Sequence, residues 1–412
     1  MPETVDTVVI GAGQAGLCAS YELRRRGRDH LVLEKGRVAE RWRSQRWDSF
    51  TLVTPNWTLR LPDHPYDRDP DGFLPRDAVV RYLESFAEDV DPPLRTGVEV
   101  RRVGAGRGGS RFRLDTSDGP LEADQVVVAV GTFQRPRIPA GADRLPDTIR
   151  QVPAADYRLP EALPEGAVLV VGSGQSGTQI ARELNEAGRR VYLSVGGAPR
   201  LPRRYRGADL FVWADRLGMF RRTVDALDDP SERFSPNPHV SGREGGRDVN
   251  LHAFARDGVR LLGRFRGARD GRARFAPDLH ASLRTIDHGV DELLAGIDAL
   301  IERDGLDAPP ADHDPGPQDG YRQEETEELD LEAAGIGSVV WATGYAWDFS
   351  WLDLPVLDDV GYPVQERGVA PVPGLYFLGL HWLHTLASGL LYGVAADAEH
   401  VVAALDAEAR RS

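Results

Sequence analysis

The chain has 412 residues, of which 41% are hydrophobic, and it carries a formal net charge of −14 at pH 7. This length predicts about two to three domains with large cores. The acidic balance excludes nucleic acid as an expected partner. No apolar run is long enough to cross a membrane, and the first strand pattern starts too close to Met1 to leave room for a signal peptide. We therefore expect a cytoplasmic protein with no membrane partner.

Hydrophobic patterning predicts alternating strands and helices along most of the chain. Residues 5–34 are predicted to form a strand, a helix that ends near Gly27, and a second strand. Residues 35–75 are irregular and rich in Trp, Arg and Pro, which is typical of functional segments because simple connections are shorter. A helix is predicted at 76–90. Later strands are expected at 98–103, 112–115, 125–130, within 258–276, at 339–342 and at 374–378, and later helices at 279–303 and about 388–408.

The strand, helix and strand pattern of the N-terminal unit recurs at 166–198. Each unit has the form of a Rossmann-like half, so the predicted fold class is α/β with two dinucleotide-binding domains. Prolines between the two units mark a crossing from one domain to the other. The predicted division is a first domain at 1–135 and 330–412, a crossing at 136–164, and a second domain at 165–325 with an inserted segment at about 199–257.

Each unit carries a glycine-rich motif between its first strand and its helix. The motifs are Gly11-Ala12-Gly13-Gln14-Ala15-Gly16 and Gly172-Ser173-Gly174-Gln175-Ser176-Gly177. In such a motif the first glycine makes the turn, the second lets a pyrophosphate approach the backbone, and the third lets the helix pack on the strand. The phosphates then rest on free N–H groups at the start of the helix. Two motifs in this setting predict two bound dinucleotides and electron transfer between them.

The residues that end the second strand of each unit differ. Glu34 ends it in the first unit, where its carboxylate can accept hydrogen bonds from the ribose hydroxyls of FAD or NAD. Ser194 stands at the matching place in the second unit and is followed by Arg200 and Arg203. A 2′-phosphate meets no carboxylate there and can pair with these arginines, so the second site is predicted to prefer NADPH over NADH. Each arginine taken alone is equally well explained as part of a solvated basic patch.

The chain has one cysteine, Cys18, in the first predicted helix. A single thiol excludes a disulfide scaffold and a C-x-x-C redox pair. Neither an H-E-x-x-H run nor a Cys/His zinc spacing is present in the sequence, so no metal site is predicted. Electrons from the nucleotides must therefore pass to an acceptor other than a dithiol of this chain.

With these motifs, the chain resembles the class B flavoprotein monooxygenases, the group of flavin-containing monooxygenase-like proteins. Besides the glycine motifs and Glu34, the resemblance rests on three stretches at the ends of predicted strands. They are Ala129-Val130-Gly131, Trp341-Ala342-Thr343-Gly344-Tyr345 and Gly374-Leu375-Tyr376-Phe377-Leu378-Gly379. The resemblance covers nearly the whole chain and implies an NAD(P)- and FAD-dependent oxidoreductase.

The family implies FAD at the first site and NADPH at the second. The segment from Arg41 to Ser49 resembles the stretch that covers the flavin, and a helix opening at Ser388 would present N–H groups to the flavin pyrimidine edge. The expected FAD-binding residues are Gly11, Gly13, Gln14, Ala15, Gly16, Glu34, Lys35, Arg41, Trp42, Val100, Gly131, Gly379, Leu390 and Leu391. The expected NADPH-binding residues are Gly172, Ser173, Gly174, Gln175, Ser176, Gly177, Ser194, Arg200, Arg203, Thr343 and Gly344.

Asn56 is the one polar residue that we nominate for catalysis, because its amide can donate a hydrogen bond to an oxygen carried by the flavin. A turn residue after Pro55 is the competing explanation. Other side chains are candidates for the wall of the flavin cavity or for substrate contact, and each is also explained as plain core. They are Trp42, Trp47, Trp57, His381, His384 and Tyr392.

One signature of the family is not matched. The family carries F-x-G-x-x-x-H and an aromatic residue between its domains, whereas this chain has the stretch from Asp147 to Arg158. Only Tyr157 and Arg158 agree with the signature, which disfavours a Baeyer–Villiger reaction in particular.

Three functions stay open. The leading one is an NADPH-driven, FAD-dependent monooxygenase that inserts one oxygen of O2 into a small molecule, at N or S, through a flavin peroxide. The second is an NADPH:acceptor reductase or NADPH oxidase on the same scaffold. The third is a flavin- or NADPH-binding protein that is not an enzyme. A homodimer is the base-rate expectation for the assembly.

Overall fold

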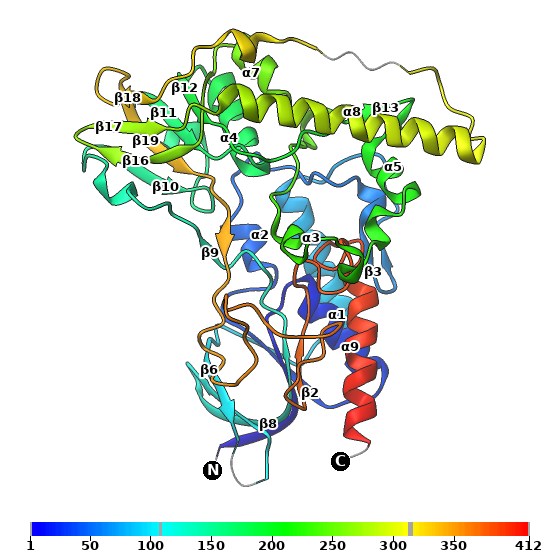
Figure 1. The fold of residues 1–412 in the computed structure, drawn as a ribbon. Helices are drawn as coiled ribbons and strands as arrows, with labels where there is room; N and C mark the ends of the chain where they lie inside the picture. Colours follow the sequence, from blue (N-terminus) through cyan, green and yellow to red (C-terminus); the bar gives the residue numbers. More distant parts are fainter. Residues whose placement is uncertain (1, 107–108, 312–315, 411–412) are drawn as a thin grey trace.

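The computed structural model describes residues 2–106, 109–311 and 316–410, and the chain forms two lobes (Figure 1). The lower lobe holds both chain ends, and the upper lobe holds the long helix α8 (Leu279–Asp304). Each lobe is built on a sheet with parallel strands, against which helices pack. This arrangement confirms the predicted α/β fold class with two Rossmann-like units.

The lower sheet contains β1 (Glu3–Ile10), β2 (His30–Glu34), β5 (Leu94–Thr96), β6 (Val100–Ala105), β7 (Phe112–Thr116), β8 (Gly119–Val128) and β21 (Leu375–Phe377). Its order is β5-β2-β1-β8-β7-β6, and β21 also pairs with β8. The pairs of β1 with β2 and β8 are parallel, whereas β6 and β7 form an antiparallel extension. Val8, Val9 and Ile10 of β1 are buried, as expected for a strand covered on both faces.

The upper sheet contains, in spatial order, β10 (Arg150–Pro153), β19 (Ile336–Trp341), β11 (Ala167–Val171), β12 (Val191–Ser194) and β15 (Arg260–Leu262). All of its pairs are parallel. Two members differ from the predicted division of the chain. β19 lies in this sheet although 330–412 was placed in the first domain, and β10 lies in it although 136–164 was expected to be a plain crossing. A short apolar run such as β19 does not reveal from sequence which of two sheets it completes.

The helices are α1 (Gln14–Arg25), α2 (Glu40–Ser44), α3 (Arg76–Val90), α4 (Gln175–Glu186), α5 (Leu210–Arg216), α6 (Arg243–Gly246), α7 (Leu251–Arg256), α8 and α9 (Val394–Ala409). α3 and α8 confirm the helices predicted at 76–90 and 279–303. α9 begins at Val394 rather than near Ser388, which corrects the predicted start. The residues before α9 form turns, because the Ser388 hydroxyl accepts hydrogen bonds from backbone N–H groups that precede it. Within the described ranges, none of these helices is long and apolar enough to cross a membrane.

The chain passes between the lobes twice, and the two passages lie side by side. They contain β9 (Arg135–Pro136) on the way out of the lower lobe and β20 (Tyr345–Ala346) on the way back. The two strands pair antiparallel, with Tyr345 opposite Pro136. The upper lobe is thus an insertion whose two ends meet at one place.

Short strands complete the structure: β3 (Arg60–Leu61) pairs with β4 (His64–Pro65), β13 (Arg204–Tyr205) with β14 (Ala208–Asp209), and β17 (Arg272–Phe275) with both β16 (Phe265–Arg269) and β18 (Glu328–Asp330). The segment predicted as an insertion at 199–257 contains β13, β14, α5, α6 and α7. It reaches the lower lobe, where Val224 N donates to His384 O at 2.8 Å and Leu386 N donates to Arg222 O at 3.2 Å. The insertion therefore contacts the turns that precede α9.

Candidate functional site

The first glycine motif forms a tight turn between β1 and α1. A Cβ placed on Gly11, whose φ is +108°, would lie 2.7 Å from the carbonyl oxygen of Ala129, and one placed on Gly16 would lie 1.8 Å from the carbonyl oxygen of Gly11. By contrast, nothing lies within 4 Å of a Cβ placed on Gly13, the N-cap of α1, and no side chain caps this helix. Open space over uncapped N–H groups at a helix start is the setting that binds a phosphate.

The second motif repeats this geometry between β11 and α4. A Cβ on Gly172, whose φ is +102°, would lie 2.4 Å from the carbonyl oxygen of Ala342, and one on Gly177 would lie 1.8 Å from that of Gly172. Gly174, the N-cap of α4, again has open space beside it and no side-chain cap. Gln175 and Ser176 are the first residues of α4, whereas the Ser173 hydroxyl is buried and accepts a hydrogen bond from Gly196 N at 2.9 Å. Each lobe thus carries one glycine turn whose helix start is uncapped and open.

Glu34 lies at the end of β2, beside the first glycine turn. Its Oε2 accepts a hydrogen bond from Ala12 N at 2.9 Å, and its Oε1 accepts one from Gly36 N at 2.7 Å. A carboxylate oxygen has room for two hydrogen bonds, so both oxygens can still accept from ribose hydroxyls. The placement of Glu34 fits the nucleoside end of a dinucleotide whose phosphates lie over Gly13.

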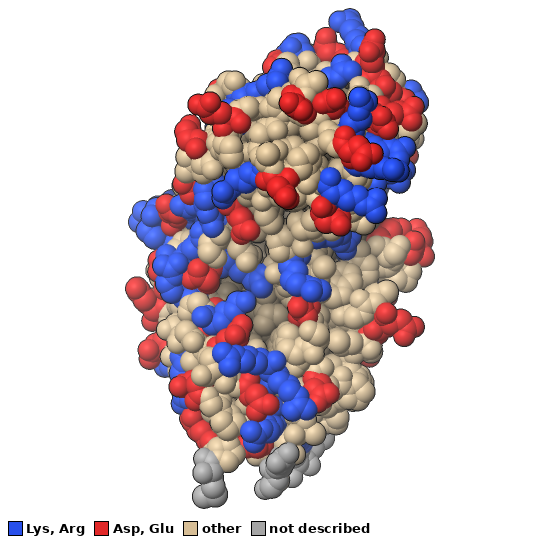
Figure 2. Space-filling model, turned by 90° about the vertical axis from the view of Figure 1, so that its left-hand side faces the viewer, with Lys and Arg blue, Asp and Glu red and all other residues tan. Residues whose placement is uncertain are grey.

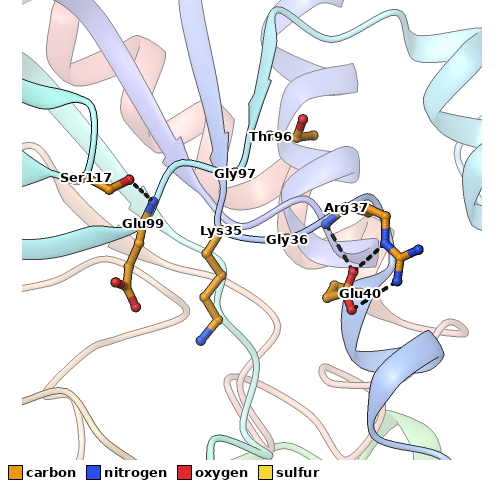
Figure 3. Close-up of a pocket in the computed structure, with 8 residues that line it drawn as sticks. All are labelled: Lys35, Gly36, Arg37, Glu40, Thr96, Gly97, Glu99 and Ser117. Atoms are coloured by element: carbon orange, nitrogen blue, oxygen red, sulfur yellow. Dashed lines mark hydrogen bonds and ion pairs between the residues drawn. The ribbon is translucent and has the colours of Figure 1, made fainter.

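A cavity of about 820 Å³ opens next to Glu34 (Figure 3). It is lined by Lys35, Gly36, Arg37, Glu40, Thr96, Gly97, Glu99 and Ser117. The Arg37 guanidinium donates to Glu40, whereas the Lys35 side chain extends away from this pair. Val100 follows directly on the lining residue Glu99, as the first residue of β6. Two residues predicted to bind FAD, Lys35 and Val100, are therefore brought to the same end of the site.

The segment predicted to cover the flavin begins with α2. Nη1 of Arg41 is buried and has no hydrogen-bond partner among the described residues. Burial lowers the pKa of Arg41, and the Glu34 carboxylate opposes this effect. A buried guanidinium N–H without an acceptor is costly, so Arg41 fits the charge of a bound pyrophosphate. Its neighbour Trp42 is half-buried and packs against the hydrophobic cores of both lobes.

The C-terminal part of the predicted FAD site also meets the first glycine motif. A Cβ on Gly379 would lie 2.6 Å from Cβ of Ala15, and Gln14 Nε2 donates to Gly389 O at 3.0 Å. The turn that holds Gly389 continues into Leu390, which is half-buried, and Leu391, which is buried. The structure therefore gathers these residues around one turn. The backbone N–H groups near Ser388, which were expected to open a helix, belong to turns that precede α9.

Residues predicted for the two cofactors meet where the lobes join. Gly131 and Gly344 lie near the two passages, with φ of +71° and +82°, and the Thr343 hydroxyl donates to Arg137 O. Figure 2 shows Lys and Arg side chains around a hollow between the lobes, on a chain whose net charge is −14. Lys and Arg side chains beside the junction can pair with anionic cofactors despite the acidic total.

The side chains proposed to select NADPH have partners inside the protein. The Ser194 hydroxyl donates to Gly263 O at 2.9 Å. Arg203 is 2% exposed and donates to Asp209 Oδ2 at 2.7 Å. Arg200 is likewise buried, with its Nη2 3.5 Å from Asp248. The structure therefore gives Ser194 and Arg203 internal roles, whereas Nε of Arg200 is buried and has no hydrogen-bond partner among the described residues.

Arg264, which sequence analysis did not identify, is better placed for a 2′-phosphate. It follows β15, the neighbour of β12 in the sheet, and its Nη2 would lie 3.2 Å from a Cβ on Gly197. Its side chain is 55% exposed, and its Nε lies 3.7 Å from Asp278 Oδ2. The signal that could have found it is the Rossmann strand order, since adjacent parallel strands end at the same edge.

Asn56, the residue nominated for catalysis, is buried in the 3-10 turn Asn56–Thr58. Its Nδ2 donates to Asp69 O at 2.9 Å, while its Oδ1 has no partner among the described residues. Nε1 of Trp57 is also buried and unpartnered there, and its ring lies edge-on to Tyr392, with 5.7 Å between the ring centroids. These orphaned polar atoms beside the C-terminal turn leave hydrogen-bonding capacity for a ligand.

The two candidate histidines belong to the same turn. Burial lowers the pKa of His381, and its carbonyl oxygen accepts a hydrogen bond from the Tyr362 hydroxyl at 3.1 Å. His384 donates its backbone N–H to Ser388 Oγ at 3.0 Å. Both histidines thus have identified contributions to the shape of the turn through their backbone groups.

His239 was not singled out from sequence. Its burial predicts that the folded protein loses stability in acid. His239 is fully buried against Ser173, and burial lowers its pKa from 6.5 to about 4. Since the unfolded chain binds this proton more readily, we expect stability to fall as the pH drops from about 6.5 to about 4, by up to about 3 kcal/mol at roughly 1.4 kcal/mol per pKa unit. Urea unfolding of the wild type and His239→Gln at pH 7 and pH 5 checks this. His239→Gln should lose less stability, and a variant of the exposed His288 should behave as wild type.

Comparisons with known proteins agree with this geometry. The family model described as pyridine nucleotide-disulphide oxidoreductase matches residues 8–207. The "Uncharacterized oxidoreductase CzcO-like" of Geobacillus kaustophilus is 32% identical over 408 residues, which cover 98% of each chain. The flavin-containing monooxygenase FMO GS-OX-like 2 of Arabidopsis thaliana is 30% identical over 226 residues, which cover 45% of this chain and 48% of that protein.

Solved structures show the same fold. The flavin-containing monooxygenase from Stenotrophomonas maltophilia aligns with a TM-score of 0.67 and 22% identity, over 98% of this chain and 99% of that one. An ornithine N-hydroxylase of Kutzneria sp., described with reduced FAD and NADP+, aligns with a TM-score of 0.65 and 17% identity, over 99% and 100% of the chains. These likenesses confirm the predicted fold, and the sequence similarity to the Arabidopsis monooxygenase confirms the predicted resemblance. Because the similarity to the Geobacillus protein spans almost both full lengths, the chain belongs to the CzcO-like oxidoreductases, which share the fold of the flavin-containing monooxygenases.

Proposed function

We propose that the protein is an FAD-dependent, NADPH-driven monooxygenase that transfers one oxygen atom of O2 to a nitrogen or sulfur atom of a small molecule. The observation that carries the proposal is the pair of glycine turns, one in each lobe. Each leaves open space at an uncapped helix start, at Gly13 and at Gly174. Two phosphate-binding turns in lobes joined at one place suit a pair of dinucleotides that exchange a hydride.

The nature of the electron acceptor supports oxygen over a disulfide. The chain has a single cysteine, Cys18, which is fully buried in α1, and burial raises the pKa of its thiol. A buried neutral thiol is a poor nucleophile, and one cysteine cannot form a redox disulfide within the chain. The protein therefore lacks the dithiol to which a disulfide reductase passes its electrons.

The residues of the chain bind and orient the cofactors. FAD supplies, when bound, the chemistry that passes electrons from NADPH to O2. The turn at Gly13, Glu34 and Arg41 would hold its anionic and ribose parts, and the turn at Gly174 with Arg264 would hold NADPH. The rings of Trp57 and Tyr392 pack edge-on beside the C-terminal turn, where they would limit the access of water and the wasteful release of hydrogen peroxide. Asn56 remains our proposed polar contact near the reacting oxygen.

An NADPH oxidase or NADPH:acceptor reductase is the second candidate, because the stretch from Asp147 to Arg158 lacks the Phe, Gly and His of the family signature. The two residues that agree with the signature, Tyr157 and Arg158, have structural contacts. The Tyr157 hydroxyl donates to Glu183 Oε2 at 2.9 Å, and the Arg158 guanidinium donates to Arg46 O at 2.5 Å and to Ser44 O. These bonds tie the crossing to α4, to the last residue of α2 and to the segment that follows α2. They hold the lobes together without contributing a side chain to oxygen transfer.

Stopped-flow spectroscopy separates the two candidates. The flavoprotein is reduced with NADPH and mixed with oxygenated buffer, with and without a panel of amines and sulfides. We expect a long-lived spectrum that differs from both reduced and oxidised flavin, and an oxygenated product from at least one member of the panel. Direct return to oxidised flavin with stoichiometric peroxide, unchanged by every panel member, contradicts the monooxygenase and favours the oxidase. A cytoplasmic location and a homodimer remain predictions.

A further inference from the structure

An aromatic cluster of Trp57, Phe211, Phe220 and Tyr392 forms where the upper-lobe insertion meets the turns that precede α9. The Tyr392 ring lies 5.1 Å from that of Phe220 and 5.7 Å from that of Trp57, measured between centroids. Phe211 of α5 stacks on Phe220 at 5.9 Å. The Tyr392 hydroxyl donates to Asp215 Oδ1 at 2.8 Å, which ties the insertion to the turn. Both lobes therefore contribute rings to the cluster.

Two buried polar atoms at this cluster have no partner. Nε1 of Trp57 and Oδ1 of Asn56 make no hydrogen bond among the described residues, and Asn56 is 2% exposed. An indole N–H can only donate a hydrogen bond, and an amide oxygen can only accept one. Because unpaired buried groups cost free energy, a donor and an acceptor are available here to a ligand with polar atoms.

Arg60 supplies a positive charge beside the same rings. Its guanidinium lies 4.7 Å from the centre of the Tyr392 ring and 5.6 Å from that of Trp57. Its backbone N–H donates to Leu391 O at 3.3 Å, which places Arg60 beside the turn expected to hold the flavin. Arg60 is exposed, and its Nε donates to Trp57 O at 3.3 Å.

The two terminal nitrogens of Arg60 have no hydrogen bond or ion pair within the part of the chain that the structure describes. A guanidinium fork held against two rings can bind a carboxylate through two parallel hydrogen bonds. The acidic group in the cluster, Asp215, is already paired, since its Oδ1 also accepts from Arg221 Nη1 at 3.0 Å. The charge of Arg60 is thus left for a ligand.

We propose that the aromatic cluster binds the apolar body of the substrate and that Arg60 selects substrates that carry a carboxylate. The preferred substrate is then a small organic acid with an apolar or aromatic body and a nucleophilic nitrogen or sulfur atom. The unpartnered Trp57 N–H is available to an oxygen of the same acid. The oxygenation of this acid rests on the proposed function, whereas its binding does not.

(Phenylthio)acetate and its neutral methyl ester provide the test, because they share the aromatic ring and the sulfur atom and differ in charge. Their Kd values are measured by calorimetry on the FAD-loaded protein with NADP+, and their kcat/KM values by sulfoxide formation. That reaction converts the sulfide, O2, NADPH and a proton into the sulfoxide, water and NADP+.

We expect the wild type to bind the acid about 10-fold or more tightly than the ester, the contribution of a hydrogen bond to a charged group. Arg60→Met should abolish this preference and leave the Kd of the ester within about 3-fold of wild type, because the rings remain. Arg60→Lys keeps the charge without the fork and should retain part of the preference.

Phe220→Leu tests the contribution of the insertion. It should weaken the binding of both compounds by a similar factor of about 5-fold, because contact with the ring does not depend on the charge of the ligand. Melting temperatures establish that the variant is folded. Wild-type affinity for both compounds would exclude Phe220 from the site and overturn the assignment of the cluster.

Arg81→Met is the matched control for the loss of charge, because Arg81 is exposed on α3 of the same lobe. It should keep the wild-type preference for the acid. Arg60→Met should also keep the wild-type FAD content and KM for NADPH, since a change in either would assign Arg60 to a cofactor and overturn the inference.

Two further results would overturn the inference: a wild type that binds the acid no more tightly than the ester, or an Arg60→Met variant that keeps the preference. If the wild type prefers the acid through Arg60 but forms no sulfoxide from either compound, the proposed monooxygenase fails for these compounds and the binding site stands. The two proposals can therefore fail separately.

Discussion

Gly13→Ala is expected to give a folded protein that no longer retains FAD, and Gly174→Ala one that retains FAD but is not reduced by NADPH. Both glycines have ordinary negative φ values, −84° and −69°, and a Cβ on either meets nothing within 4 Å. An alanine therefore fits the protein itself and obstructs only a phosphate that approaches the backbone. Overpacking of this kind costs about 1–3 kcal/mol, or roughly 5- to 150-fold in cofactor affinity.

The measurement is FAD content after gel filtration, together with the rate of flavin reduction at increasing NADPH concentration. Gly289→Ala in α8 is the control, because its Cβ also meets nothing within 4 Å and it lies far from both motifs along the chain. It should leave both readouts unchanged. If Gly13→Ala holds FAD with wild-type affinity, no phosphate lies over this turn, and the assignment of the first motif is wrong.

Arg203→Met is expected to lower the free energy of unfolding by about 3–5 kcal/mol, because it leaves the partner carboxylate of a buried ion pair without its cation. Arg203 Nε donates to Asp209 Oδ2, its Nη1 donates to Val53 O at 2.8 Å, and its guanidinium lies 4.2 Å from the centre of the Phe73 ring. These contacts join the upper lobe to the segment that follows α2. The variant should nevertheless keep the wild-type ratio of NADPH to NADH efficiency.

Arg264→Met is expected to have the opposite effects: stability should be nearly unchanged, and the preference for NADPH over NADH should weaken. Its exposed side chain supports little of the fold, so stability should change by less than about 1 kcal/mol. The ratio of kcat/KM for NADPH to that for NADH should fall by about 10- to 100-fold, the loss of a charge-assisted bond to a 2′-phosphate. Urea unfolding and steady-state kinetics of both variants provide the comparison. A changed coenzyme ratio in Arg203→Met with none in Arg264→Met would restore the assignment made from sequence.

Features that depend on a short stretch of chain were predictable. A strand, a glycine turn and a helix follow one another within the unit that ends at Glu34, so pattern and spacing identified it without long-range information. The same reasoning located the second unit. Long helices such as α3 and α8 were also found, because their apolar spacing persists over several turns.

Features that depend on distant parts of the chain were not predictable in this way. Arg203 donates a hydrogen bond to the carbonyl oxygen of Val53, which lies 150 positions away in the sequence. The residues around Arg203 in the sequence therefore give no sign that its side chain is buried. β19 completes the upper sheet between β10 and β11, although its sequence would suit either sheet. The start of α9 was misplaced because one buried hydroxyl, that of Ser388, competes with helical hydrogen bonding for backbone N–H groups. Arg264 was missed because its neighbour β12 lies far from it in sequence.

Because β9 pairs antiparallel with β20, the upper lobe is an insertion whose two ends are adjacent. Its entry and exit strands are hydrogen-bonded neighbours, with Arg135 opposite Ala346, so the two chain ends that join the lobes lie at one place. Insertions whose ends lie close together are well tolerated by the host fold. Exchanging residues 137–344 for a part of a relative that keeps the contacts of Arg203 with Val53 and of Arg222 with Leu386 should therefore change the coenzyme half of the protein while leaving the flavin half folded.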